Sequence, residues 1–344
     1  LTHPLFADAS RMTTLTSPHD LLAAIPFLVG FKPENSIILI SVTEESVSMA
    51  MRIDFPDSLD DAQIATLLGH LKRDRAEAVL SIYYLPDRAN GSDSVISSLT
   101  TAIETENLVL RESIVVSSGR WRSLLCQDQE CCPDEGSPMP DLHDSRIAAE
   151  QVASGKPLPF DTIDELVASI SALDEDIELI EFINQVEKID YEGDPLPQQR
   201  EGAEAIVDFI ADFQAEGLCR DKKLIALVLV RLLDLQVRDF ALGSVTEDSL
   251  HTYFSAWRWL MRIAPQGYVA PVATLFAAVA YERGDGALAQ RALDRVEADN
   301  PDYAMLRLFR EVFSRGWSPD NFAAMRAELH PKICDSLFSG TMNV

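Results

Sequence analysis

The residues with the strongest chemical potential lie in one segment, Gly119 to Pro138, which holds three of the five cysteines. Cys126, Cys131 and Cys132, followed by His143, are side chains that could bind zinc tetrahedrally. Their spacing is not that of paired zinc knuckles, so other interpretations stay open. These are a redox pair through a Cys126–Cys131 or Cys126–Cys132 disulfide, a nucleophilic cysteine with His143 as its base, and reduced thiols packed as small apolar residues.

The same segment begins with an arginine-tryptophan-arginine triplet, Arg120, Trp121 and Arg122. In an extended backbone the two arginines share one side and Trp121 faces the other. The arginines could then clamp a carboxylate or phosphate, and ligands often bind where strands of an open α/β sheet end. The alternative is an edge strand with two solvated arginines and a core tryptophan. The predicted ligand-binding residues are this triplet together with Cys126, Cys131 and Cys132.

The composition is that of an acidic globular protein with enough apolar residues to form a hydrophobic core. The chain has 344 residues, 47% of them apolar, and a net charge of −26, which suggests about two globular domains. The acidity is concentrated in residues 161–216, which hold 2 basic and 17 acidic residues. Such a balance argues against nucleic-acid binding, which needs a basic surface. The acidic stretch is either a solvated helix face or a docking surface for a basic partner.

No apolar run is long enough to span a bilayer, so we expect no membrane segment. The chain also starts without the basic and apolar regions of a secretory signal. We therefore expect a cytoplasmic protein whose thiols are reduced. Leu1 is either an alternative start or precedes the natural start at Met12.

The first half alternates predicted strands with helices. Ser17 and Pro18 predict a helix start, and two strands, Ser36–Val42 and Val47–Ile53, predict a hairpin. Two further strands and two intervening helices then follow: Asp60–Arg73, Ala78–Tyr84, Asp93–Glu106 and Ser113–Ser117. This alternation predicts an α/β domain over residues 12–150 with a mixed, mainly parallel sheet.

The sequence pattern of the second half predicts helices throughout. After a linker at Ser154–Pro159, apolar periodicity predicts four helices: Asp161–Lys188, Arg200–Ala215, Asp221–Arg238 and Glu247–Ile263. The stretch Ala273–Pro301 resembles a tetratricopeptide-type helical hairpin, and a second pair of helices follows it. We expect an all-α domain over residues 157–340 with tetratricopeptide-like hairpins.

Three motifs in order resemble an actinobacterial family known only as a domain of unknown function, family 4192. They are the start Ser17-Pro18-His19-Asp20-Leu21-Leu22-Ala23-Ala24-Ile25-Pro26, the central Cys131-Cys132-Pro133, and the later Asp285-Gly286-Ala287-Leu288-Ala289. The resemblance implies a cytoplasmic actinobacterial protein and favours Met12 as the start. It supplies no catalytic residue.

No complete catalytic set can be assembled from the sequence. The leading prediction is a non-enzymatic binding or adaptor protein that presents its helical half to a protein partner, with its oligomeric state open. One alternative is a small-anion-binding protein or enzyme that uses Arg120, Arg122 and the three cysteines. Another is a structural zinc-binding protein, zinc being the one cofactor that the residue types suggest.

Overall fold

The computed structural model describes residues 14–87, 91–315 and 317–338. Both alternative starts, Leu1 and Met12, lie outside these residues. The chain forms two compact units that divide between Glu165 and Leu166. The domain bounds 12–150 and 157–340 remain predictions.

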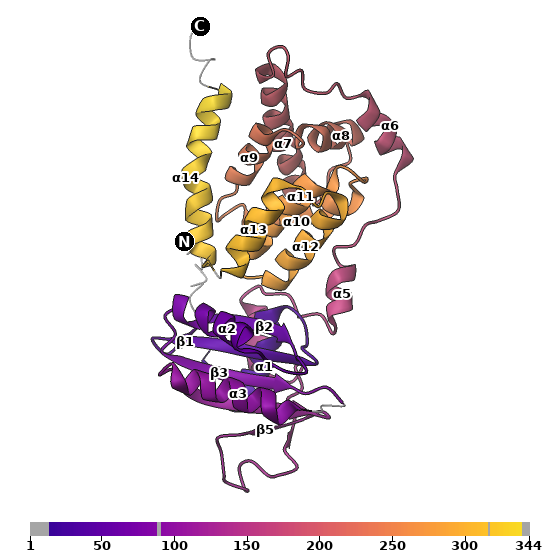
Figure 1. The fold of residues 1–344 in the computed structure, drawn as a ribbon. Coiled ribbons are helices and arrows are strands. Elements are labelled where there is room, and N and C mark those ends of the chain that lie inside the picture. Colours follow the sequence, from indigo (N-terminus) through magenta and orange to yellow (C-terminus); the bar gives the residue numbers. More distant parts are fainter. Residues whose placement is uncertain (1–13, 88–90, 316, 339–344) are drawn as a thin grey trace, which may run out of the picture. The chain divides into compact units, whose positions relative to one another are not determined.

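The first unit is a six-stranded sheet with helices on both faces (Figure 1). Its elements in chain order are α1 (Pro18–Val29), β1 (Ser36–Thr43), β2 (Ser46–Asp54), α2 (Asp61–Arg73), β3 (Ala78–Tyr84), α3 (Ser92–Thr105), β4 (Val109–Ser117), β5 (Arg120–Ser123), β6 (Ser137–Pro138) and α4 (Arg146–Ala153). The predicted start of α1 is confirmed. The Ser17 side chain caps it by accepting from the Asp20 backbone N–H, with Pro18 in the first turn.

The prediction of a mainly parallel sheet was wrong. The strand order is β2-β1-β3-β4-β5-β6, and only β3 and β4 are parallel neighbours. The α2 connection does make β3 run in the same direction as β2, as a helical crossover requires. However, β1 lies between these two strands and is antiparallel to both. The β4–β5 hairpin and the β5–β6 pair add two further antiparallel contacts.

Successive side chains of each strand point to opposite faces of the sheet, so apolar residues pack against helices on both faces. One cluster joins Leu39, Val79 and Val115 of the sheet to apolar residues of α2 and α3, including Leu68 and Leu99. On the other face α1 packs against α4. Strand β5 lies next to the short edge strand β6, which pairs with it at two residues, and its side chains alternate between exposed and buried.

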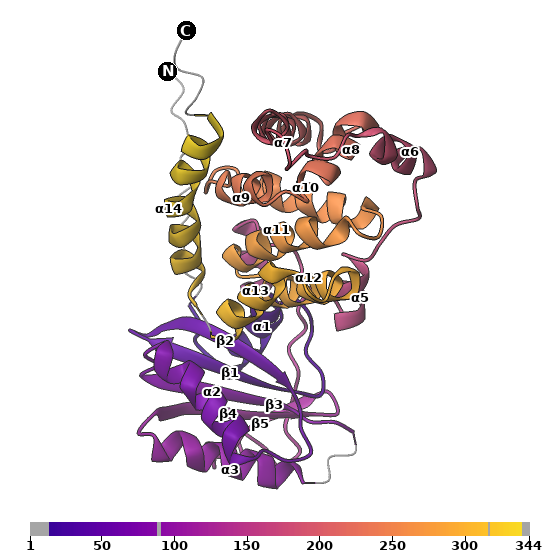
Figure 2. The same ribbon diagram turned by 45° about the horizontal axis from the view of Figure 1, so that its top comes forward.

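The second unit is a bundle of helices (Figure 2). Its helices are α6 (Ile177–Gln185), α7 (Leu196–Glu216), α8 (Lys222–Arg231), α9 (Leu235–Gly243), α10 (Leu250–Ile263), α11 (Val269–Glu282), α12 (Gly286–Asp299), α13 (Ala304–Ser314) and α14 (Pro319–Phe338). A short helix, α5 (Ile163–Ala168), spans the division between the units. Within the described residues, no helix combines the length and apolarity that a membrane span needs.

Two predicted helices are each broken in the structure. The predicted helix Asp161–Lys188 is α5 and α6 with an irregular stretch between them, and α6 starts where the Asp176 side chain caps the Leu179 N–H. The predicted helix Asp221–Arg238 is α8 and α9, because Asp234 caps a new helix. Apolar periodicity runs through both breaks, whereas the capping carboxylates mark them.

The predicted helical hairpin at Ala273–Pro301 is present as α11 and α12, which pack side by side (Figure 2). Its packing residues Phe276, Ala289, Leu293 and Val296 are almost completely buried. Its likeness to tetratricopeptide repeats remains a prediction.

Candidate functional site

The arginine-tryptophan-arginine triplet lies on β5, the second strand of a tight hairpin. Ser118 and Gly119 form the turn with positive φ angles of 51° and 72°, which supply the twist of a two-residue hairpin loop. Trp121 is buried and its ring meets that of His19 edge-on, with centroids 5.2 Å apart. The arginines are exposed on the opposite face. Trp121 and the arginines therefore cannot line one pocket together.

Arg120 is committed to the loop that follows β5. Its Nε donates to the carbonyl oxygens of Glu135 at 2.8 Å and Gly136 at 3.1 Å, and its Nη2 donates to Gly136 at 2.6 Å. These contacts use two of its five N–H groups and hold the guanidinium against the loop. The Arg122 side chain makes no hydrogen bond or ion pair with any described residue, and it lines a groove of about 320 Å³ between β5 and α3. Arg120 is not among the residues that line this groove, so the two arginines do not share it, and the anion site built from both remains a prediction.

The start of the cysteine loop is fixed by a buried serine at the end of β5. Ser123 Oγ accepts from the backbone N–H groups of Leu125 and Cys126, each at 3.1 Å, and donates to the Glu112 carboxylate at 2.6 Å. Leu124 N–H donates to the Ser113 carbonyl at 2.7 Å. Cys126 is therefore tied to the rigid β4–β5 hairpin.

The structure brings all three loop cysteines together. The sulfur atoms of Cys126, Cys131 and Cys132 lie within 4.8 Å of one another, and all three are free thiols. The adjacent pair converges because the chain turns here: Cys132 N–H donates to the Asp128 carbonyl at 2.7 Å, and the Asp128 carboxylate accepts from Glu130 N–H. Alternation of side chains applies to extended backbone and not to such a turn.

His143 does not belong to this group. Its backbone N–H donates to the Asp141 carboxylate, in the connection between β6 and α4. The predicted fourth metal ligand, which is also the predicted catalytic base, is therefore not placed with the thiols. Within the described residues, the cluster consists of sulfur ligands alone.

Burial changes the ionisation of one of the three thiols. Removal from solvent, together with the neighbouring thiols, raises the pKa of Cys132 to about 11. Its thiol is therefore protonated at neutral pH. Since a nucleophilic cysteine needs a lowered pKa, this environment disfavours Cys132 as a nucleophile.

A glycine makes the return of the loop possible. Gly136 has a φ of +74°, and a Cβ atom built on it would lie 2.8 Å from the Trp121 carbonyl oxygen. Both the left-handed backbone and the close approach require glycine here. After this glycine, β6 pairs with β5, and Met139 N–H donates to the Gly119 carbonyl. Both ends of the loop are thus attached to the same strand.

A second candidate site lies in the helical unit, where the break between α5 and α6 opens a groove. Three arginines hold consecutive carbonyl groups of the break: Arg258 binds Ser169 at 3.2 Å, Arg295 binds Ile170 at 2.6 Å, and Arg262 binds Ser171 at 3.1 Å. Burial lowers the pKa of Arg258 and Arg295, but guanidinium groups stay charged at neutral pH. The arginines thus satisfy carbonyls that the end of α5 leaves free.

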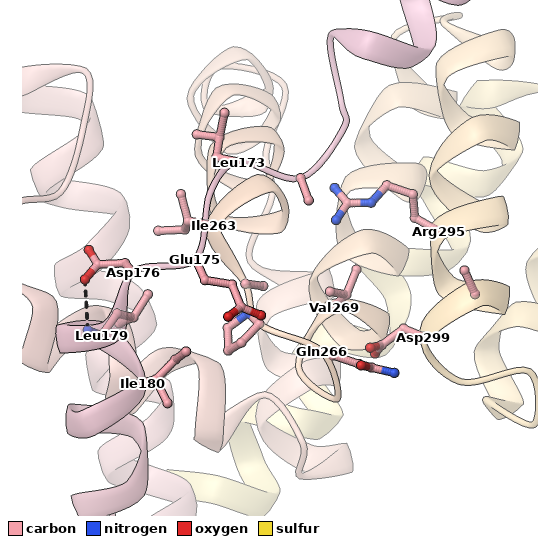
Figure 3. A pocket seen from close by; sticks show the side chains of 14 residues that line it. Leu173, Glu175, Asp176, Leu179, Ile180, Ile263, Gln266, Val269, Arg295 and Asp299 are labelled. Atoms are coloured by element: carbon pink, nitrogen blue, oxygen red, sulfur yellow. Dashed lines mark hydrogen bonds between the residues drawn. The ribbon is translucent and has the colours of Figure 1, made fainter.

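This groove has a volume of about 310 Å³ and a largely apolar lining (Figure 3). Its apolar side chains come from the α5–α6 break, α6 and the ends of α10 and α11: Leu173, Leu179, Ile180, Ile263 and Val269. Two charged side chains on its lining, those of Arg295 and Asp299, already have hydrogen-bond partners. Arg295 donates to Ile170, and Asp299 accepts from the N–H groups of Gly267 and Ala270.

Glu175, by contrast, makes no hydrogen bond or ion pair with any described residue. Its side chain extends into the groove (Figure 3). Sequence periodicity missed this site, because it treated the break as continuous helix. The available signal was the run Asp174-Glu175-Asp176, whose last member is a favourable N-cap.

The fold and these sites define a two-unit protein: an α/β sheet unit with a thiol-bearing loop, and a helical bundle with a largely apolar groove that carries Glu175. Residues 18–320 match the family described as "Domain of unknown function (DUF4192)". The chain therefore belongs to that family, and the resemblance seen in its three motifs is confirmed. Searches of curated proteins and of solved structures found no match.

Proposed function

We propose that this chain is a non-enzymatic binding protein whose helical unit docks a basic segment of a partner protein in the groove between the α5–α6 break and α10–α12. The observation that carries the proposal is the unpaired carboxylate of Glu175 in a largely apolar groove. A peptide that places one apolar side chain next to a lysine or arginine matches this combination.

The apolar part of the groove supplies an anchor position. Leu173 is 46% exposed and lines the groove together with the buried Leu179 and Val269. Covering such a side chain with an apolar partner removes it from water at about 25 cal/mol per Å². Compact apolar pockets of this kind are where interface hot spots concentrate.

The charge of the surrounding chain supports the same occupant. Residues 161–216 carry 2 basic and 17 acidic residues. Such a surface attracts a basic segment and repels nucleic acid. Arg295 also lines the groove, but its guanidinium donates to the Ile170 carbonyl and forms no ion pair with Glu175. The Glu175 carboxylate is therefore left for a basic side chain of the partner.

The test uses the full chain and fluorescent peptides with one leucine or phenylalanine between two arginines, against a matched set with glutamates in place of the arginines. Fluorescence anisotropy should show binding of the basic set alone, weakened by salt. Glu175→Lys should lower the affinity at least tenfold, which is about 1.4 kcal/mol.

Glu204→Lys is the matched control, because Glu204 is an exposed carboxylate on α7 in the same acidic stretch but outside the groove lining. Its effect should be clearly smaller than that of Glu175→Lys. Equal losses in the two variants would mean that the peptides respond to overall charge. Failure of the wild-type chain to bind the basic set would refute the proposal.

A further inference from the structure

We propose that Cys126, Cys131 and Cys132 bind one zinc ion through three thiolates, with the fourth coordination position open to solvent or to an outside ligand. This site belongs to the sheet unit and is independent of the groove proposed above. The observation that carries it is the convergence of the three sulfur atoms within 4.8 Å.

The sulfur separations are close to those of a bound ion. Zn–S bonds of about 2.3 Å in a tetrahedron place two sulfur atoms about 3.8 Å apart. The sulfur atoms of Cys131 and Cys132 are 4.0 Å apart. Bringing the whole set from within 4.8 Å to that spacing needs movements of about 1 Å or less at the ends of side chains.

The backbone of the loop holds the thiols in this arrangement before any ion binds. Cys126 is fixed through its N–H bond to Ser123, and Cys132 through its N–H bond to the Asp128 carbonyl. At the far end of the loop, the Arg120 guanidinium holds the carbonyls of Glu135 and Gly136. A pre-formed loop reduces the conformational entropy that ion binding must otherwise overcome.

The charge of the loop favours a cation. Between Cys126 and Gly136 the sequence contains four acidic residues and no lysine or arginine: Asp128, Glu130, Asp134 and Glu135. Three thiolates add further negative charge, which a divalent ion compensates as it displaces the thiol protons. The same acidic surroundings oppose a free thiolate, because a reactive cysteine is usually stabilised by nearby basic groups.

The ligand type selects the class of metal. Magnesium and calcium require oxygen ligands, whereas thiolates bind zinc and other soft ions. Within the described residues, no histidine or carboxylate joins the three sulfurs. Three protein ligands and an open position are the arrangement of zinc sites that accept an outside ligand, and Cys131, which is exposed, leaves this position accessible.

The experiment titrates the full chain, reduced and stripped of metal, with cobalt(II) and then with zinc(II). Cobalt is the probe because thiolate ligands give it intense charge-transfer absorption, and zinc should displace it at one equivalent per chain. Cys131→Ser should weaken zinc binding at least about 100-fold, since loss of an outer-shell contact alone typically costs 10–100-fold. Cys334→Ser, which changes a cysteine of the helical unit, should leave binding unchanged.

Cys132→Ser provides a second test, with circular dichroism to confirm that each variant folds. The proposal is overturned if the reduced wild-type chain gives no thiolate-to-cobalt absorption. It is equally overturned if Cys131→Ser and Cys132→Ser both bind zinc as tightly as the wild type, because the ion would then lie on acidic side chains elsewhere. Neither result depends on peptide binding by the helical unit.

Discussion

Substitution of Gly136 by alanine should disrupt the cysteine loop more than any other glycine-to-alanine change on its hairpin. The position has two separate requirements for glycine: a φ of +74° and a space in which a Cβ atom would lie 2.8 Å from the Trp121 carbonyl oxygen. The first requirement costs an alanine about 1–2 kcal/mol. The second forces backbone to move, which typically costs about 1–3 kcal/mol more.

Gly119→Ala is the control that separates these two costs. Gly119 also has a positive φ, +72°, but no atom lies within 4 Å of the position of its Cβ. It should therefore lose only the conformational term. The difference between the two variants, about 1–3 kcal/mol, measures the close approach of Gly136 to Trp121.

The assay is hydrogen exchange followed by mass spectrometry on peptides from β4 to β6, because the chain has two units and global unfolding need not be two-state. Amides in Gly136→Ala should exchange about fivefold to about 140-fold faster than in Gly119→Ala, at tenfold per 1.4 kcal/mol. The zinc affinity of Gly136→Ala should fall as well, because the loop loses its anchored end. Equal exchange in the two variants would refute the steric reasoning.

Two further predictions concern ion pairs elsewhere in the fold. Arg326 and Glu282 form a bidentate pair with side chains that are 5% and 6% exposed, and Arg326 also donates to the Val245 carbonyl, so Arg326→Met should destabilise the helical unit by about 3–5 kcal/mol. Urea denaturation would check this, and a loss below 1 kcal/mol would show that the pair is dispensable. Burial opposes ionisation of Asp20, but hydrogen bonds from Thr16 and the Arg146 guanidinium outweigh it and lower its pKa. Because the folded pKa lies below the unfolded value, Asp20 stabilises the fold above the unfolded pKa and loses this effect as pH falls through the folded pKa. The stability gap between wild type and Asp20→Asn should therefore be largest near neutral pH and close in acid, whereas a gap that persists at pH 2 would contradict the assignment.

Local patterns predicted the parts of the structure that depend on neighbouring residues. The cap of α1 follows from Ser17 and Pro18, and the opposite faces of Trp121 and the two arginines follow from strand alternation. The position of β1 between β2 and β3 could not be predicted in this way. Strand order depends on which apolar faces pack best in three dimensions, and no local signal marks it.

The two candidate sites were harder to predict because distant residues create them. The α5–α6 break is held by Arg258, Arg262 and Arg295, which lie 89, 91 and 125 residues from their acceptors. Convergence of Cys131 with Cys132 depends on a turn, and adjacent residues in a strand would have diverged. Residue types alone identified the cysteine segment. Which of its residues come together, the three cysteines without His143, is seen only in the folded loop.

Arginine has the same structural use at both candidate sites. Arg120 binds carbonyls of the cysteine loop, and Arg258, Arg262 and Arg295 bind carbonyls of the α5–α6 break. These positive charges stabilise irregular backbone and are not available to compensate carboxylates on the surface. With 29 basic and 55 acidic residues in the chain, the side chains left to meet a ligand are predominantly anionic. Accessible sites on such a protein favour positively charged ligands, whether a metal ion at the thiols or a basic side chain beside Glu175.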